Sequence, residues 1–178
     1  MEGQPAQTPR RAVECYLALI EPLLTQILRA GRFELTFVIR KAQPAEEDLE
    51  VPEFVVDFSG PDVDLLLGKN GALLNALEYV VLKAVRLEEE LFGQITFDCQ
   101  DWRRLRAEEL RLTAQVAAAR VVETGDPFPL NPMSPRERRI IHLALRDQPR
   151  VRTVSEGVGP ERKVVIHPAS SPGRSPAS

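Results

Sequence analysis

The stretch GKNG, residues 68–71, combines residue types that could hold a phosphate. Glycine lets another backbone or a phosphate come close, because it carries no side chain. Lys69 adds a positive charge, and the apolar-periodic run after Gly71 predicts a helix whose first N–H groups would face the same point. The stretch is therefore a candidate binding site for a nucleic-acid backbone, with a plain turn as the alternative.

Two other interpretations of this stretch fit less well. Asn70-Gly71 is typical of a hairpin turn, but a hairpin needs two-residue alternation on both sides, and the residues after Gly71 follow a helical period. A nucleotide-binding P-loop needs the pattern G-x-x-x-x-G-K-[ST], and GKNG has neither that spacing nor the hydroxyl that contacts magnesium. What remains is a G-x-x-G connection between a short apolar turn, 63–67, and a long helix.

A second candidate lies in the stretch RRIIH, where an arginine stands four residues before a histidine. Ser134, Pro135 and Glu137 predict the start of its helix, since serine caps, proline takes the first position and glutamate follows three residues after the cap. The helical period places isoleucines on one face and basic residues on the opposite face, namely Arg138, Arg139, His142 and Arg146. Such a face is usually only solvated surface, and phosphate binding is the alternative.

The elements around GKNG predict a small α+β unit. Apolar residues at helical spacing predict a helix over 13–30 that ends at Gly31. Two-residue alternation predicts strands within 32–41 and 54–60, separated by a polar, acidic loop, and a third strand over 94–99. The order is helix, strand, strand, helix, helix, strand.

The second half of the chain predicts another α+β unit. An arginine-rich helix starts near residue 101, and the proline-rich stretch 126–135 predicts an extended loop before the capped helix, which should run to about residue 146. Two strands within 151–155 and 162–167 flank a glycine-bearing turn. The ends, 1–12 and 169–178, are rich in Pro, Ser and Ala and are predicted to be disordered.

These motifs and their order resemble two known domains. Residues 13–99, with GKNG between the two helices, resemble a type II KH domain, whose GxxG loop clamps single-stranded nucleic acid. Residues 100–168 resemble the R-3-H domain, named for its Arg-xxx-His motif, and by that resemblance Arg138 and His142 are the signature pair. The tandem is similar to the Jag (SpoIIIJ-associated) family of bacterial RNA-binding proteins.

The resemblance implies a fold, a ligand and a set of contacts. The fold class would be α+β, with a three-stranded KH sheet followed by a small R-3-H domain. Single-stranded RNA, or single-stranded DNA, would be held by two residue groups, namely Gly68, Lys69, Asn70 and Gly71, and Arg138, Arg139, His142 and Arg146. The protein would act as an RNA chaperone or post-transcriptional regulator. Another small KH protein is an implied partner, and we expect this chain to lack the extra N-terminal domain that many members carry.

The charge distribution leaves a second function open. Residues 1–99 carry a net charge of −8 and residues 100–168 a net charge of +4. The basic half favours nucleic acid, because phosphate contacts dominate affinity. The acidic half, including Asp62 and Asp64 just before GKNG, favours a protein-interaction adaptor with vestigial RNA binding.

Other classes of protein find little support in the sequence. We see no metal-site spacing, nucleophile elbow, kinase motif or cofactor motif, so we expect neither an enzyme nor a cofactor. Cys15 and Cys99 form no disulfide framework and fit a reducing compartment. Without a signal peptide or a long apolar run, we expect no membrane span and a cytoplasmic location.

Overall fold

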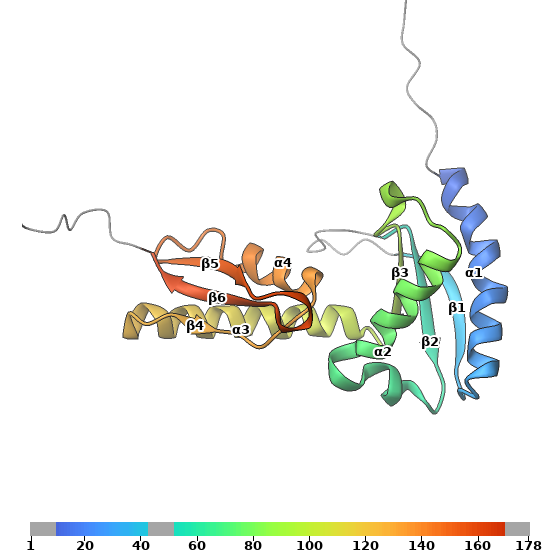
Figure 1. The fold of residues 1–178 in the computed structure, drawn as a ribbon, viewed down its shortest axis with the longest axis horizontal. Coiled ribbons are helices and arrows are strands. Elements are labelled where there is room, and N and C mark those ends of the chain that lie inside the picture. The colour runs from blue at the N-terminus through green and yellow to red at the C-terminus, as the bar shows by residue number, and fades with distance from the viewer. Residues whose placement is uncertain (1–9, 43–51, 170–178) are drawn as a thin grey trace, which may run out of the picture. The chain divides into compact units, whose positions relative to one another are not determined.

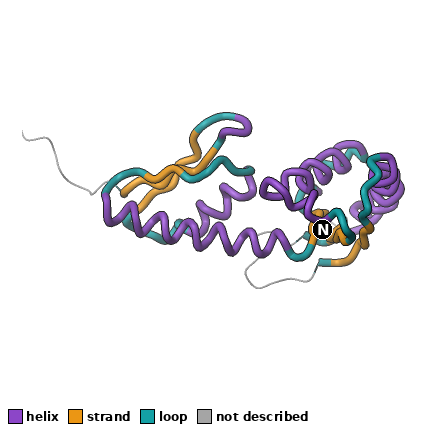
Figure 2. The backbone as a smooth tube through the Cα atoms, turned by 90° about the horizontal axis from the view of Figure 1, so that it is seen from below, coloured by secondary structure: helices purple, strands orange, loops and turns teal. Residues whose placement is uncertain are grey.

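The structure, a computed structural model, describes residues 10–42 and 52–169, and these form two compact units. One unit ends at Trp102 and the other begins at Arg103, three residues beyond the boundary expected at residue 100. The predicted tails and most of the acidic loop lie outside the described residues. Figures 1 and 2 show a helix-and-sheet arrangement within each unit, and the expected α+β class is confirmed.

The N-terminal unit follows the predicted order of elements. Its helices are α1 (Arg10–Ala30) and α2 (Val63–Ala84), and its strands are β1 (Thr36–Lys41), β2 (Phe54–Ser59) and β3 (Ile95–Cys99). A 3-10 turn, Glu89–Leu91, precedes β3. The sheet order is β1-β2-β3, with β1 antiparallel and β3 parallel to β2. Helix α1 begins at Arg10, inside the stretch that was predicted to be disordered.

Two-residue alternation gives this sheet an inner face. Phe37 pairs with Phe58, and Val56 pairs with Phe97, so these side chains point to the same side. The ring centroids of Phe58 and Phe97 lie 5.6 Å apart. The helices cover this face with fully buried side chains, including Ile20, Leu24, Leu74 and Val81. The opposite face carries the Arg40–Asp57 ion pair at 3.1 Å and an exposed Val38.

Helix α2 is long and apolar enough, by length and composition alone, to cross a membrane, contrary to the expectation from the sequence. Its backbone is non-helical at residues 68–71, however, so the helical parts 63–67 and 72–84 are each shorter than the roughly 20 residues that a span needs. Leu66, Leu74 and Val81 are buried in the core. Of the apolar window 28% is buried, so the helix packs one face against the core and exposes the rest.

The C-terminal unit contains two helices and one sheet. Helix α3 (Trp102–Thr124) begins at the last residue of the N-terminal unit, and α4 is Pro135–Ala144. The strands are β4 (Phe128–Pro129), β5 (Val151–Glu156) and β6 (Lys163–Pro168), and β6 lies between the other two. A 3-10 turn, Gly159–Glu161, precedes β6. Strand β4 was not predicted, because two residues beside prolines give no alternation to detect.

A buried ion pair ties α3 to the start of α4. The predicted capping box is present, since the Ser134 hydroxyl accepts from the Glu137 N–H and the Glu137 carboxylate accepts from the Ser134 N–H at 2.9 Å. Glu137 Oε1 also accepts from Arg106 Nε at 2.8 Å, and both side chains are almost buried. The apolar core beneath it is formed by residues of α3, α4, β5 and β6, among them Leu110, Val121, Ile141, Val151 and Ile166.

Candidate nucleic-acid interface

The GKNG stretch is a sharp left-handed turn between the two parts of α2. Gly68 is extended, with φ −54° and ψ 149°, and Lys69, Asn70 and Gly71 have φ of 51°, 57° and 69°. Left-handed backbone costs a residue with a side chain about 1–2 kcal/mol, and two of these three residues carry one, so the turn needs support from its surroundings. The expected GxxG connection between two helical parts is therefore present in the backbone.

The ring of Trp102 packs against this turn at Gly71. A Cβ placed on Gly71 would lie 2.5 Å from Cη2 of the Trp102 ring, so the ring occupies the space that any side chain at this position would need. Trp102 packs against the core of the N-terminal unit and Gly71 is buried. Gly71 is therefore required by the fold, through both its positive φ and its contact with Trp102.

Gly68 differs from Gly71 in both respects. Its φ and ψ suit any residue, and a Cβ placed on it would meet no atom of the described residues within 4 Å apart from its own chain neighbours. The fold of the described residues therefore gives no reason for glycine at this position. A ligand backbone that came close to the turn would require such an uncovered backbone at its first residue.

Lys69 and Asn70 lie between the glycines with exposed side chains. The helical part from residue 72 presents its first N–H groups at the same place, where an anion is favoured. Asp62, which seemed unfavourable for phosphate binding, accepts a hydrogen bond from the Glu34 backbone N–H at 2.8 Å. This carboxylate therefore has a structural role in anchoring the segment that leads into β1.

The second candidate group divides into two pairs in the structure. The sequence placed all four residues on one basic helix face, with a merely solvated surface as one interpretation. In the structure Arg138 and His142 are half-buried against β5, whereas Arg139 and Arg146 are exposed, so the face is not uniformly solvated. Helical periodicity cannot show this, since it reports on one element and not on its neighbours.

Hydroxyl groups of β5 hold the half-buried pair. Arg138 Nη1 donates to Ser155 Oγ at 3.1 Å, and the His142 ring contacts Ser155 Oγ at 2.9 Å through Nε2 and Thr153 Oγ1 at 2.6 Å through Nδ1. In neutral histidine one ring nitrogen donates to its hydroxyl partner and the other accepts from its partner, so the two bonds run in opposite directions. Burial, and next the positive charge of Arg138, lower the pKa of His142.

The arginine of this pair is not fully satisfied within the protein. Its Nε is buried and has no hydrogen-bond partner among the described residues, whereas Nη1 is used by Ser155. A buried guanidinium N–H without an acceptor costs free energy comparable to a lost hydrogen bond. An acceptor that reached this point would relieve that cost.

Three residues of these sites were missed at the sequence level. Thr153 and Ser155 alternate along β5, so their spacing could have placed both hydroxyls on one face of the strand. Trp102 is the first residue of α3, and no local pattern connects it with Gly71.

The thiol of Cys99 is not a reactive group of the site, because burial, and next the negative charge of Asp57, raise its pKa. Within 10–42 and 52–169 no cluster of possible metal ligands occurs.

Comparison with known proteins finds one family model and several curated relatives. The family model of the R-3-H domain matches residues 108–168, which include α4 and β5. The chain carries an R-3-H domain. The RNA-binding protein KhpB of Clostridium symbiosum is 37% identical over 114 residues, or 64% of this chain and 51% of that protein. KhpB of Bacillus subtilis is 34% identical over 110 residues, or 61% of this chain and 53% of that protein.

A third relative covers a smaller share of its own length. KhpB of Lactiplantibacillus plantarum is 33% identical over 111 residues, which are 62% of this chain and 34% of that protein. The chain therefore spans about half or less of the curated relatives it matches. Together with the R-3-H domain, these matches confirm the resemblance to the Jag family.

The contrast between the two glycines predicts different effects of the same substitution. Gly71→Ala should lower the free energy of unfolding of the N-terminal unit by about 2 kcal/mol or more, because it adds a strained φ and a clash with Trp102. Gly68→Ala should change it by less than about 0.5 kcal/mol. Urea unfolding followed by the fluorescence of Trp102 measures both, and equal losses would contradict the assignment.

The lowered pKa of His142 predicts a pH-dependent stability. The unfolded chain takes up this proton near the ordinary value of 6.5, whereas the folded chain takes it up only at lower pH. Stability is therefore fully present above that value and is lost as the pH falls through the folded pKa. Thermal unfolding between about pH 7.5 and about pH 5 should show this loss, and His142→Gln should flatten it. His167→Gln is the control, and a flattening there instead would contradict the assignment.

Proposed function

We propose that this protein binds single-stranded RNA through two sites, one in each unit, and catalyses no reaction. Gly68 carries the proposal, because it is the one residue of GKNG that has a standard backbone conformation and open space around it. The approach of a ligand to this backbone would explain why the residue is glycine, which the contacts of the fold do not explain. The R-3-H match and the names of the KhpB relatives support RNA as that ligand.

At the first site the turn would act as a backbone clamp. A phosphate would lie against Gly68, with the N–H groups that open the second part of α2 as donors and the Lys69 ammonium as counter-charge. Asn70 would add a neutral donor and acceptor. This is the arrangement that a KH domain uses for about four nucleotides. The contacts would go mainly to the backbone, so sequence preference would be modest.

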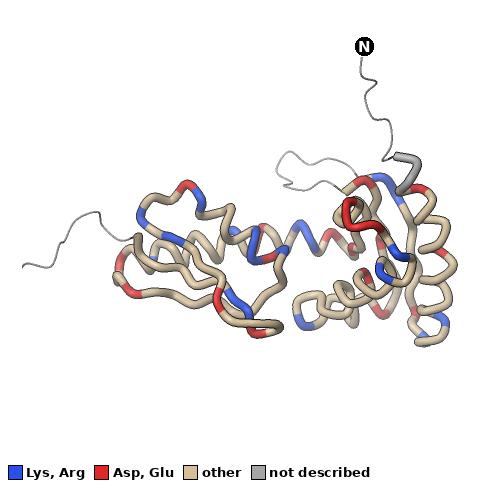
Figure 3. The backbone as a smooth tube through the Cα atoms, turned by 45° about the horizontal axis from the view of Figure 1, so that its top comes forward, with Lys and Arg blue, Asp and Glu red and all other residues tan. Residues whose placement is uncertain are grey.

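At the second site the four residues would have two roles. The exposed Arg139 and Arg146 would contact phosphates, because their guanidinium groups lie at the surface. Arg138 and His142 would bind at the edge of the same face, where an RNA acceptor could take the buried Nε proton of Arg138. Their bonds to Thr153 and Ser155 would keep that edge rigid. Figure 3 shows basic positions along α3 and α4 with acidic ones between them.

Joining both sites in one chain would raise the effective concentration of the second site once the first is filled. Two weak contacts could then give useful affinity to a strand long enough to reach both. Such a protein would remodel RNA or regulate its use after transcription, as a soluble protein of the cytoplasm. Affinity should fall steeply with added salt, because each phosphate contact releases counterions.

A protein-interaction adaptor is the second candidate function, and one observation favours it. The second part of α2 exposes an apolar stripe formed by Leu73, Ala76 and Val80, which recur at helical spacing. A helix of another small KH protein could pack on this stripe. That contact is compatible with RNA binding, and it becomes the main function only if RNA does not bind.

A salt series with a fluorescent pool of single-stranded RNA tests the proposal. Lys69→Asp/Asn70→Asp and Arg139→Ala/Arg146→Ala should each weaken binding about tenfold or more at low salt and flatten the salt dependence. Both variants change exposed side chains, so the fold should persist.

Gln26→Asp/Arg29→Asp is the matched control, because it makes the same change of charge on exposed positions of α1. It should bind nearly as the unmodified protein does. Binding without salt dependence, or a loop variant that behaves like this control, would overturn the proposal and favour the adaptor.

A further inference from the structure

Helix α3 presents a second apolar face, opposite to the one it buries. Its inward side chains pack in the core of the C-terminal unit, for example Leu110, Ala114 and Val121. On the other side Leu105, Leu112 and Val116 are 51%, 62% and 72% exposed. Surface leucine and valine are ordinary one at a time, but three along one helix form a continuous stripe.

Two charged residues lie on the same stripe. With about 100° per residue, Leu105, Glu109, Leu112, Val116 and Arg120 fall within about 40° of Val116. Their spacings of four and three residues are those of a helix seam that packs against another helix. Glu109 stands toward the start of the helix and Arg120 toward its end, so the stripe has opposite charges at its two ends.

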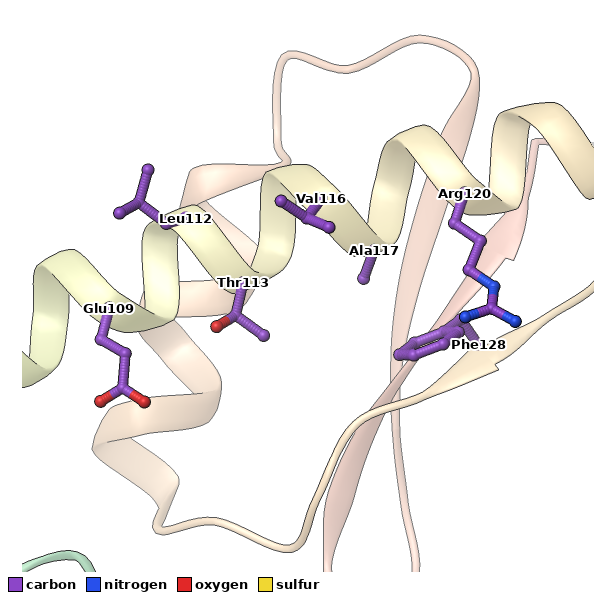
Figure 4. A pocket seen from close by; sticks show the side chains of 7 residues that line it. All are labelled: Glu109, Leu112, Thr113, Val116, Ala117, Arg120 and Phe128. Atoms are coloured by element: carbon purple, nitrogen blue, oxygen red, sulfur yellow. The ribbon is translucent and has the colours of Figure 1, made fainter.

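Beside this stripe lies an open pocket of 390 Å³, lined by α3 and the side chain of Phe128. Figure 4 shows its seven lining residues, six of them along α3. The Arg120 guanidinium lies 5.4 Å from the centre of the Phe128 ring. Glu109 binds Arg106 through Oε2 at 2.8 Å, which leaves Oε1 as a further acceptor.

We propose that this face of α3 binds the same face of a second copy of the chain, with the two helices antiparallel. A two-fold axis midway between Glu109 and Arg120 places Glu109 of each copy against Arg120 of the other. The same axis brings Leu112 and Val116 of one copy close to Val116 and Leu112 of the other. Exposed apolar side chains therefore meet between two attractive charged pairs.

This self-complementarity is what selects a second copy as the occupant. A two-fold interface uses the same patch twice, and a stripe that runs from Glu109 through apolar residues to Arg120 complements itself when the two copies are antiparallel. The charged ends are separated by roughly 16 Å along the helix, so the contact is small and the dimer should be weak and concentration-dependent. The proposal is independent of RNA binding.

Sedimentation equilibrium of the full chain, up to on the order of 0.5 mM, tests the proposal through a charge exchange. Glu109→Arg alone and Arg120→Glu alone each create two repulsive pairs and should weaken self-association about tenfold. An equimolar mixture of these two variants restores both attractive pairs, so it should associate nearly as the unmodified protein does. Circular dichroism melts establish that each variant is folded.

Val116→Lys should abolish the dimer, because it places a charge at the centre of the seam. Leu19→Lys, at an exposed position of α1, is the control and should leave the dimer unchanged. A chain that stays monomeric over the whole range would overturn the proposal. So would a dimer that is insensitive to the charge reversals, or a mixture that associates no better than either variant alone.

Discussion

The candidate site of the N-terminal unit depends on the contact between the Trp102 ring and Gly71. Three consecutive left-handed residues are unfavourable for a chain of L-amino acids, and two of them here carry side chains. The ring fills the space beneath the turn, so only glycine fits at position 71. This constraint ends the first part of α2, starts the second part and leaves Lys69, Asn70 and the open backbone of Gly68 at the surface. The geometry of the binding site that we propose is thus set by the packing of Trp102 against Gly71.

Arg138 and His142 of the C-terminal unit are also part of the packing between elements. Arg138 and His142 hold α4 to β5 through Ser155 and Thr153, whereas the neighbouring Arg139 and Arg146 are exposed. The pair that we propose for RNA binding therefore also has a structural role. The buried Nε of Arg138 has no acceptor in the described part of the chain. The same side chain that holds α4 to β5 therefore keeps one N–H group for the proposed RNA contact.

Much of the fold follows from local patterns, and the parts that do not are long-range. The alternation around Phe37 and Phe58, the capping box of Ser134 and Glu137 and the G-x-x-G break in α2 are each properties of a few neighbouring residues. The ion pair of Arg106 with Glu137, the ring beneath Gly71 and the strand over His142 join residues far apart in sequence. No period or propensity encodes such contacts. The GKNG turn was therefore predictable as a connection, whereas the different roles of its two glycines required the structure.

If the turn at 68–71 is an RNA-binding surface, its backbone amides should respond directly to the ligand. The most direct measurement is a titration of the ¹⁵N-labelled chain with a short single-stranded RNA, followed by amide resonances at low and high salt. We predict that the amides of 68–73 shift first, with the indole N–H of Trp102, and that the shifts disappear at high salt. Shifts confined to other surfaces, with these amides unmoved, would contradict RNA binding at the turn.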